Sequence, residues 1–494
     1  MNLNMKIKNV KCVKELAFSF PLEPGIYAIT GENGSGKSTV ISCASSVFYQ
    51  MPMTEFFGSP NNASIEFELE GAIRKWSFNG QKWYSESSEK KMKLNGFYEG
   101  SIIFGNRFRD TKLSVINILD QVSKNDLFQA STFVKENLGL ILRNDKNYYK
   151  DLYVVKKNVA DKMGLTRVTY CNISKNGDLI SQPRMSTGEN LLLSILSSLE
   201  VLYNKRTKHN DGRPCIVFLD EIELALHSSA LRRLVLFLKG TALSVDLSIF
   251  FSTHSIELLR EIKAQNIFYL SSLNNDTIMV TNPCYPAYAT RNLYGDDGYG
   301  NDLVILVEDD LAKIIIEKIL ISKNIAQNIR IKILPTGGWT NTISMAYDVI
   351  TSNLLQKGTK IAVILDQDIK SQVPEFLSAH KQFSGIKIDY LPIASLEKYL
   401  RSNLVLQTDK KLFSILDTYL FQKRPLQDVL SAYGRDIDKD DNDGKTLYGY
   451  LLNEVRSMRK DREDIVDLVV RFILDNDADS IDKLAGYLRK KISE

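Results

Sequence analysis

The amino-acid sequence predicts an α/β protein with two domains built on parallel sheets and a helical C-terminal region. The chain has 494 residues, more than a single hydrophobic core usually holds, so we expect two or three domains. A glycine-rich loop at 31–39 lies between an apolar strand pattern and an apolar helical pattern. From residue 301 onward, apolar strands alternate with helical stretches, which is typical of a parallel sheet with helices on its faces.

Changes in composition and periodicity predict where the domains begin and end. We expect a first domain at 1–285, with a helical insertion at about 113–163. A stretch rich in Asn, Asp, Gly and Pro predicts a linker at 286–300. A second domain follows at 301–405, and 406–494 form its helical, charged C-terminal part.

The composition narrows the class of protein. Hydrophobic residues make up 44% and charged residues 25%, as in ordinary globular proteins, and no apolar run is long enough for a membrane span. The start of the chain has no signal-peptide pattern. Five scattered cysteines without a CxxC pair predict a cytoplasmic protein without disulfides or a zinc knuckle. The net charge of +4 is too small to indicate nucleic-acid binding by itself.

The loop at 31–39 matches the pattern GxxxxGK[ST] between a strand and a helix. Its glycines let backbone N–H groups curl around a phosphate, Lys37 reaches the β and γ oxygens, and Ser38 offers a hydroxyl to Mg²⁺. The residues expected to bind nucleotide are Asn33, Gly34, Ser35, Gly36, Lys37, Ser38 and Thr39.

Three further motifs follow the loop along the chain. The buried strand at 215–219 ends in Asp220, a candidate Mg²⁺ ligand, and Glu221, a candidate base for the attacking water. Ser186 and Gly188 precede an apolar helix, whose N-terminus suits a γ-phosphate presented from outside. The strand at 247–252 leads to His254, a polarisable imidazole after a core strand.

Along the chain these four motifs come in the order phosphate loop, signature, Asp220-Glu221 and His254, and in that order they resemble the ABC-type ATPases, particularly the branch that includes the SMC and Rad50 proteins. The resemblance implies ATP and Mg²⁺ as cofactors and a homodimer or higher homo-oligomer joined through the ATPase heads, in which Ser186 and Gly188 complete the partner's ATP site. The chain departs from the usual signature at Thr187 and Glu189, so we expect nucleotide binding to persist and turnover to be slow. Residues 104–107 fall where the family's glutamine loop lies but contain no glutamine.

Acidic residues follow two strands of the second domain. The strand at 303–307 ends in Glu308, and the strand at 360–365 ends in Asp366 and Asp368. Ligand sites in open parallel sheets gather at the carboxyl ends of strands. Carboxylate oxygens are the hard ligands that Mg²⁺ and Mn²⁺ prefer, so we expect these three residues to hold a metal.

A strand-end Glu, a glycine after the second strand and a DxD motif resemble the Toprim domain. An ABC-type ATPase followed by Toprim resembles the OLD (overcoming lysogenization defect) family over most of the chain. The resemblance implies a metal-dependent DNA endonuclease in anti-phage defence, as in Gabija-like systems or retron effectors. It further implies DNA as substrate, Glu397 as a metal ligand and Lys445 as the cation for the scissile phosphate. The implied operon partner is a helicase, or a reverse transcriptase with its multicopy DNA–RNA.

One departure from the Toprim pattern leaves alternatives open. The family usually has an acid where this chain has Ala312, and a glycine where it has Asp309. Asp309 or Asp310 could supply the missing carboxylate. The sequence therefore also allows a nucleic-acid-binding ATPase scaffold with an inactive Toprim domain, or an RNA-processing Toprim nuclease. A topoisomerase is disfavoured, because no tyrosine stands in a recognisable nucleophile context.

Overall fold

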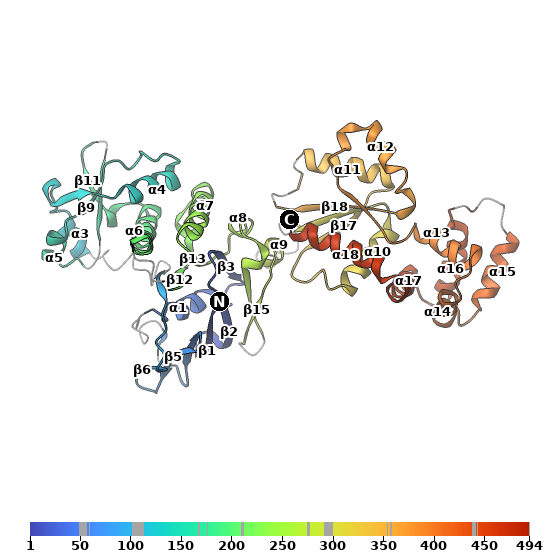
Figure 1. Cartoon of the computed structure of the whole chain (residues 1–494), viewed down its shortest axis with the longest axis horizontal. Coiled ribbons are helices and arrows are strands. Elements are labelled where there is room, and N and C mark those ends of the chain that lie inside the picture. Colours follow the sequence, from blue (N-terminus) through green and yellow to red (C-terminus); the bar gives the residue numbers. More distant parts are fainter. Residues whose placement is uncertain are drawn as a thin grey trace. The chain divides into compact units, whose positions relative to one another are not determined.

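The chain divides into two compact units, Met1–Gly295 and Asp296–Glu494. Figure 1 labels their elements. The computed structural model describes residues 1–48, 57–58, 60–100, 113–165, 168–174, 176–208, 212–273, 277–290, 300–352, 354–355, 358–436, 441 and 443–493.

A largely parallel sheet in the order β15-β14-β3-β13-β12-β7 forms the centre of the first unit. Its strands are β3 (Gly25–Gly31), β7 (Asn95–Glu99), β12 (Cys215–Leu219), β13 (Leu247–Ser252), β14 (Ile267–Ser272) and the antiparallel edge strand β15 (Ile278–Thr281). The strands β3, β13 and β12 are parallel neighbours. Their carboxyl ends therefore share one edge, which brings the phosphate loop, the acids after β12 and the histidine after β13 to the same side of the sheet.

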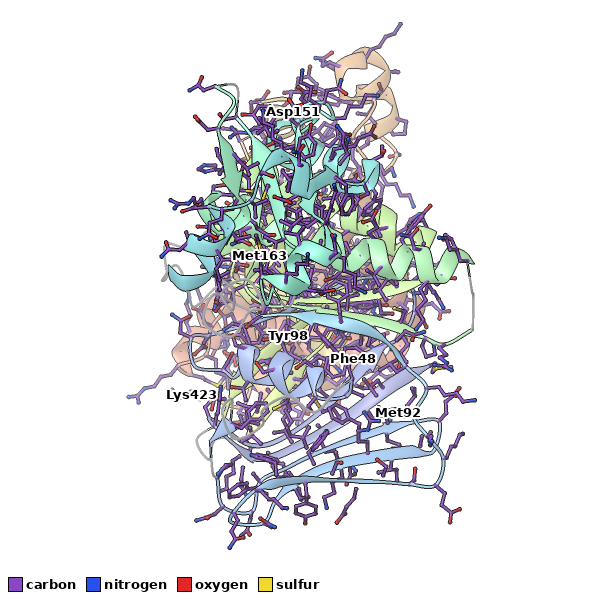
Figure 2. All side chains as sticks on the ribbon, turned by 90° about the vertical axis from the view of Figure 1, so that its left-hand side faces the viewer. Phe48, Met92, Tyr98, Asp151, Met163 and Lys423 are labelled. Atoms are coloured by element: carbon purple, nitrogen blue, oxygen red, sulfur yellow. The ribbon has the colours of Figure 1, made fainter. Side chains whose placement is uncertain are left out.

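Two hydrophobic cores cover the faces of this sheet. On one face, Phe218 and Phe250 pack against α1 (Lys37–Ser45) and an antiparallel sheet in the order β2-β1-β4-β5-β6. Phe48 and Tyr98, labelled in Figure 2, belong to the same cluster. The strands of that second sheet are β1 (Asn2–Val10), β2 (Val13–Pro21), β4 (Ser64–Leu69), β5 (Ala72–Phe78) and β6 (Trp83–Ser87). On the other face lie α4 (Thr132–Arg143), α6 (Thr187–Lys208) and α7 (Ser228–Ser244). Two short helices, α8 (Ile256–Leu259) and α9 (Pro286–Ala289), complete the unit.

The predicted helical insertion contains strands as well as helices. Besides α3 (Leu113–Leu119), α4 and α5 (Lys157–Lys162), it holds β8 (Leu127–Gln129) and β9 (Leu152–Val155). These strands pair with β10 (Tyr170–Ile173) and β11 (Leu179–Ser181) in the order β11-β10-β9-β8. The helical prediction fails here because Leu152 and Val154 face the main core, whereas Val155 faces a separate small cluster. Burial on both faces removes the alternation that identifies a strand.

The second unit is built on a wholly parallel sheet in the order β17-β16-β18-β19. Its strands are β16 (Leu303–Val307), β17 (Ile331–Pro335), β18 (Lys360–Leu365) and β19 (Ile388–Tyr390). One face packs against α11 (Trp339–Thr351) and α12 (Val373–Ala379), and α10 (Asp310–Ser322) and α18 (Ala478–Ser493) contact the sheet from the other side. The predicted α/β class is confirmed for both units.

The helical C-terminal region is also confirmed. It consists of α13 (Leu396–Arg401), α14 (Lys410–Leu420), α15 (Leu426–Asp436), α16 (Lys445–Ser457), α17 (Arg462–Asn476) and α18. The helix α16 packs against α13, while α17 returns to α10 and α18 returns to the sheet. Within the described segments, no helix combines the length and apolarity needed to cross a bilayer.

Candidate functional site

The phosphate loop of the first unit has the backbone geometry that an anion site needs. Gly36 adopts φ 87° as the N-cap of α1, and a side chain at Gly31 would clash with the carbonyl of Leu270. The Nζ atom of Lys37 donates to the carbonyl oxygens of Gly31 (3.1 Å) and Glu32 (2.7 Å). The loop and the helix N-terminus therefore direct backbone N–H groups and one ammonium toward the same place.

The charge on Lys37 is balanced by acids of the neighbouring strand end. Burial lowers the pKa of Lys37 to about 8, although the charges of Glu221, Asp220 and Glu223 act in the opposite direction. The lysine is only 6% exposed. A buried ammonium facing these carboxylates is suited to hold a polyphosphate whose metal ion sits on the acids.

The two acids after β12 are held by the end of β13. The carboxylate of Asp220, 1% exposed, accepts a hydrogen bond of 2.5 Å from the Ser252 hydroxyl. The same Ser252 oxygen accepts the backbone N–H of Glu221 at 2.9 Å. Glu221 itself adopts φ 50°, a left-handed conformation that is uncommon outside glycine. Such strain is often found at functional residues, where the surrounding contacts fix it.

Glu223 is a candidate functional residue that the sequence analysis missed. Its Oε1 accepts hydrogen bonds from the Thr253 hydroxyl (3.0 Å) and the backbone N–H of His254 (2.8 Å). Burial raises the pKa of Glu223. The signal available in the sequence was an acid two residues after Glu221 with no lysine or arginine within eight residues of it.

His254 lies on the loop that Glu223 fixes. Burial, and then the charge of Lys37, lowers the pKa of His254 to about 4. The imidazole is therefore neutral across the physiological pH range. This electrostatic coupling to Lys37 joins the histidine to the phosphate-loop side of the site.

The signature segment at the start of α6 is engaged in internal contacts. Glu189 Oε2 accepts the backbone N–H of Ser186 (2.8 Å) and its hydroxyl (2.7 Å), and Ser186 Oγ accepts the backbone N–H of Glu189 (3.3 Å), so the two residues form a capping box. The buried Tyr149 donates its hydroxyl to Glu189 Oε1 at 2.6 Å. A Cβ at Gly188 would lie 2.7 Å from the Ala225 carbonyl, so the signature packs onto the turn that follows Glu221. The candidate loop at 104–107 lies outside the described residues.

Four buried polar atoms around this edge have no hydrogen-bond partner among the described residues. They are Thr30 Oγ1, Ser35 Oγ, Glu223 Oε2 and His254 Nδ1. Buried polar atoms are nearly always bonded to protein, water or ligand. Together with the phosphate loop and Asp220, these unused atoms fit a bound nucleotide and its Mg²⁺.

In the second unit, Glu308 and Asp366 lie at the ends of neighbouring strands. Glu308 Oε1 accepts the backbone N–H of Asp366 at 2.8 Å, and the Glu308 carbonyl accepts the N–H groups of Gly337 (2.9 Å) and Gly338 (3.1 Å). Asp366 is 7% exposed. Burial raises its pKa to about 8, with further contributions from Glu308, Asp309, Asp368 and Glu397.

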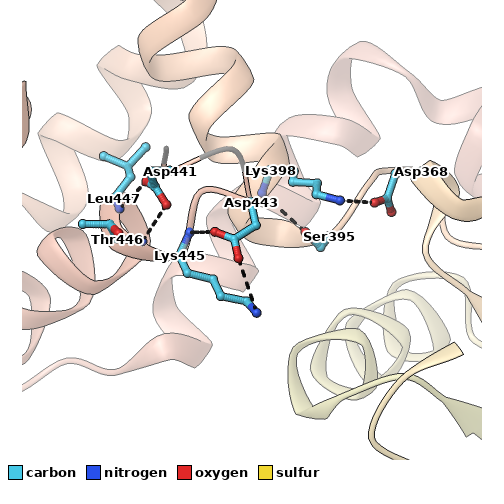
Figure 3. A network of polar contacts seen from close by, with 8 residues as sticks. All are labelled: Asp368, Ser395, Lys398, Asp441, Asp443, Lys445, Thr446 and Leu447. Atoms are coloured by element: carbon cyan, nitrogen blue, oxygen red, sulfur yellow. Dashed lines mark hydrogen bonds and ion pairs between the residues drawn. The ribbon is translucent and has the colours of Figure 1, made fainter. Parts of the chain in front are cut away.

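Asp368 faces a lysine that the sequence analysis did not single out. Lys398, in α13, donates from Nζ to Asp368 Oδ2 at 2.5 Å, as Figure 3 shows. The other oxygen, Oδ1, is buried without a partner among the described residues. The neighbouring Glu397 has its pKa raised by burial and by Asp309.

Lys445, the predicted phosphate-binding lysine, stands at the start of α16. Its side chain is 73% exposed and lies 3.5 Å from Asp443. A side chain at Gly444 would clash with the carbonyl of Glu397, so this helix start is packed against α13. The charge of Lys445 lowers the pKa of Glu397 and so partly offsets its burial.

The two acids considered as replacements for the missing carboxylate behave differently. Asp309 caps α10 by accepting the N–H of Ala312 at 2.8 Å, and it raises the pKa of Glu308, Asp366 and Glu397. Asp310 instead forms an ion pair with Arg462 at 3.8 Å. Asp309 therefore shares the electrostatic field of the acidic cluster.

Whether the acidic cluster of the second unit can bind a divalent metal depends on how many of its carboxylate oxygens are close together and not already bonded. Among the described residues, no group of three or more His, Cys, Asp or Glu side chains is gathered closely enough to hold an ion as the side chains stand. Asp368 is turned to Lys398, and Glu308 to a backbone N–H. The hard oxygens, the buried Asp366 and the unpartnered Asp368 Oδ1 nevertheless fit a divalent cation in their chemistry.

Comparison with known proteins identifies the class of the first unit. Residues 4–202 match the family model described as AAA domain, a stretch that includes the phosphate loop and the signature. The first unit thus contains an AAA-type P-loop ATPase domain, which confirms the predicted ATP binding and ATPase class. The match ends at residue 202 and does not reach the second unit.

Several solved structures are similar to the chain. An SMC head bound to the C-winged helix domain of ScpA shares 13% identity at a TM-score of 0.37, covering 56% of this chain and 96% of that one. The SMC head domain from Thermotoga maritima shares 13% identity at 0.31, covering 57% and 99%. The protein cbiO1 from Clostridium perfringens, part of the ABC transporter complex cbiONQ, shares 14% identity at 0.27, covering 57% and 90%. No curated protein matches the chain.

Proposed function

We propose that this protein is an ATPase with ABC-type heads that gates a divalent-metal-dependent DNA endonuclease. The observation that carries the nuclease half is the buried Asp366, which lies beside Glu308 and Asp368 at the carboxyl ends of adjacent parallel strands. Crowded carboxylates repel one another unless a cation joins them. The resemblance to the OLD family supports a role in anti-phage defence with an operon partner.

The ATPase half uses residues gathered at one edge of the central sheet. Lys37, which donates to two loop carbonyls, would bind phosphate oxygens instead when nucleotide is present, and Asp220 and Ser38 would hold Mg²⁺. Bound Mg²⁺–ATP supplies the phosphoryl group. Glu221 takes the proton of the attacking water, and the neutral His254 contacts the γ-phosphate. Ser186 and Gly188 of each head complete the ATP site of the partner subunit.

The nuclease half uses the acidic cluster of the second unit. Glu308, Asp366, Asp368 and Glu397 would hold the metal, which supplies Lewis acidity and an activated water when bound. Lys445 would bind the scissile phosphate through its exposed ammonium. Lys445 lines an open hollow of about 360 Å³ together with Arg424 and Glu454, which lie 3.9 Å apart.

A second candidate function is an ATPase scaffold that binds nucleic acid without cutting it. The Asp368–Lys398 ion pair and the buried Ala312 in place of an acid favour this alternative. A lysine on a would-be metal ligand lowers the affinity for the metal.

Cleavage assays separate these functions. Purified protein is incubated with supercoiled plasmid or with structured RNA, in Mg²⁺ or Mn²⁺, with and without ATP. We expect plasmid nicking to require the metal, and its rate to change when ATP is added. Binding of DNA without any nicking supports the scaffold, and cleavage of RNA alone supports the RNA-processing alternative; both results overturn the DNA endonuclease.

A further inference from the structure

Lys398 contacts a carboxylate that is one of the expected metal ligands, Asp368. Its ammonium lies 2.5 Å from Asp368 Oδ2, and the residue before it in α13 is Glu397, another expected ligand. Ser395 caps this helix through the backbone N–H of Lys398 (3.5 Å), which helps to fix where the lysine side chain starts. The side chain is 41% exposed, so it retains room to move.

The surroundings of Lys398 are strongly acidic. Its contact partner Asp368 and the charges of Asp366 and Asp443 all stabilise the ammonium. The other lysine near the cluster, Lys445, lies 3.5 Å from Asp443. Among the residues that the structure describes, Lys398 is the lysine in ion-pair contact with Asp368 of the DxD motif, and it contributes one positive charge to a cluster of several carboxylates.

We propose that Lys398 is a built-in counter-ion that occupies the metal position in the metal-free protein and moves to a DNA phosphate when a divalent cation displaces it. This inference rests on the proposed nuclease function. A divalent ion can bind several carboxylates at once, whereas the ammonium offers one charge, so the metal prevails once its concentration is sufficient. Removing an ion pair of this partly exposed kind should tighten metal binding by about fivefold.

Displacement of Lys398 from Asp368 by a metal should also affect DNA binding. A lysine freed from Asp368 can contact the phosphate backbone of DNA as a point charge. Metal binding and DNA binding are then linked through one side chain. A Lys398→Met protein should bind metal more tightly and, once it holds metal, should bind DNA more weakly. General loss of structure cannot produce two changes of opposite sign.

The first test is Mn²⁺ binding to the full-length, ATP-free protein by isothermal titration calorimetry. The wild type, Lys398→Met, Lys398→Gln and Asp366→Asn are compared, and Asp366→Asn defines which binding belongs to this site. Lys313→Met is the matched control, because Lys313 is similarly exposed and forms its ion pair with Glu317 on α10. We expect both Lys398 variants to bind Mn²⁺ about fivefold more tightly and the Lys313 variant to equal the wild type.

The second test is binding of a DNA duplex, with Ca²⁺ as a metal that fills oxygen sites, or with a chelator. In Ca²⁺ the Lys398→Met protein should bind DNA about threefold more weakly, the loss of one phosphate contact. In the chelator the two proteins should bind alike, because the ammonium is then held by Asp368. If the wild type shows no Asp366-dependent Mn²⁺ binding, the proposed nuclease site and this inference both fall. If that binding exists but the Lys398 variants bind Mn²⁺ no more tightly, the counter-ion is refuted while the nuclease proposal stands.

Discussion

Replacing Glu223 by alanine tests whether this residue holds the His254 loop beside the Asp220-Glu221 strand end in the proposed ATP site. Glu223 Oε1 accepts two hydrogen bonds, from the Thr253 hydroxyl (3.0 Å) and from the N–H of His254 (2.8 Å). Thr253 is completely buried, so truncation leaves its hydroxyl without an acceptor. Hydrogen bonds to charged groups contribute about 1.5 kcal/mol each at the lower end of their range.

The two bonds together stabilise the His254 loop by about 3 kcal/mol. If that loop is needed in the transition state but not for nucleotide binding, this free energy corresponds to about a 100-fold lower kcat. KM should stay near the wild-type value, because Lys37 and the phosphate loop keep their contacts. Glu223→Gln retains a carbonyl acceptor, so it should lose only about tenfold, in keeping with the weaker neutral bonds.

The assay is steady-state ATP hydrolysis, with nucleotide binding followed by a fluorescent analogue. Glu257→Ala is the matched control, because Glu257 lies just beyond the same loop and, within the described part of the chain, its side chain accepts a hydrogen bond of 2.8 Å from the Ser255 hydroxyl alone, at an exposed site. A Glu223→Ala protein that melts like the wild type and hydrolyses ATP at the wild-type kcat refutes the positioning role.

Three further predictions concern the same unit. Glu221→Gln should bind ATP but hydrolyse it at least about 100-fold more slowly, and wild-type turnover in a single-turnover assay would remove Glu221 from its role. Mixing Lys37→Ala with Ser186→Arg protein should restore part of the ATPase activity through one intact composite site; verified heterodimers without any activity speak against sites shared between subunits. Since the pKa of His254 is lowered to about 4, the curve of ATP turnover against pH should show no titration midpoint from this histidine between pH 6 and 8. A midpoint near pH 6.5 that disappears in His254→Gln contradicts the burial of the ring. The lowered pKa of His254 also makes the free energy of unfolding depend on pH. The stabilisation from the neutral ring is fully present above about pH 6.5 and is lost as the pH falls through about 4.

The elements that position the sites could be predicted because they follow local patterns. The strands that carry Asp220, His254, Glu308 and Asp366 are short apolar runs that end in polar residues, and parallel neighbours bring those ends together.

The contacts that set the charges of the sites could not be predicted, because they join residues far apart in the chain. Thr253 and His254 reach Glu223 across 30 and 31 positions, and Lys398 reaches Asp368 across 30. The late lysine Lys445 was favoured by family resemblance, although Lys398 makes the contact with the DxD motif. Side-chain direction in the folded chain, rather than spacing, decides these pairs.

We propose that ATP hydrolysis and DNA cleavage belong to separate units of one chain. The most direct test measures both activities in Asp366→Ala protein, with plasmid nicking and phosphate release followed in the same Mn²⁺ and ATP buffer. Because Asp366 lies in the second unit, whereas the phosphate loop lies in the first, we expect nicking to be lost and ATP hydrolysis to stay within about twofold of the wild type. Nicking by Asp366→Ala at the wild-type rate would contradict the account.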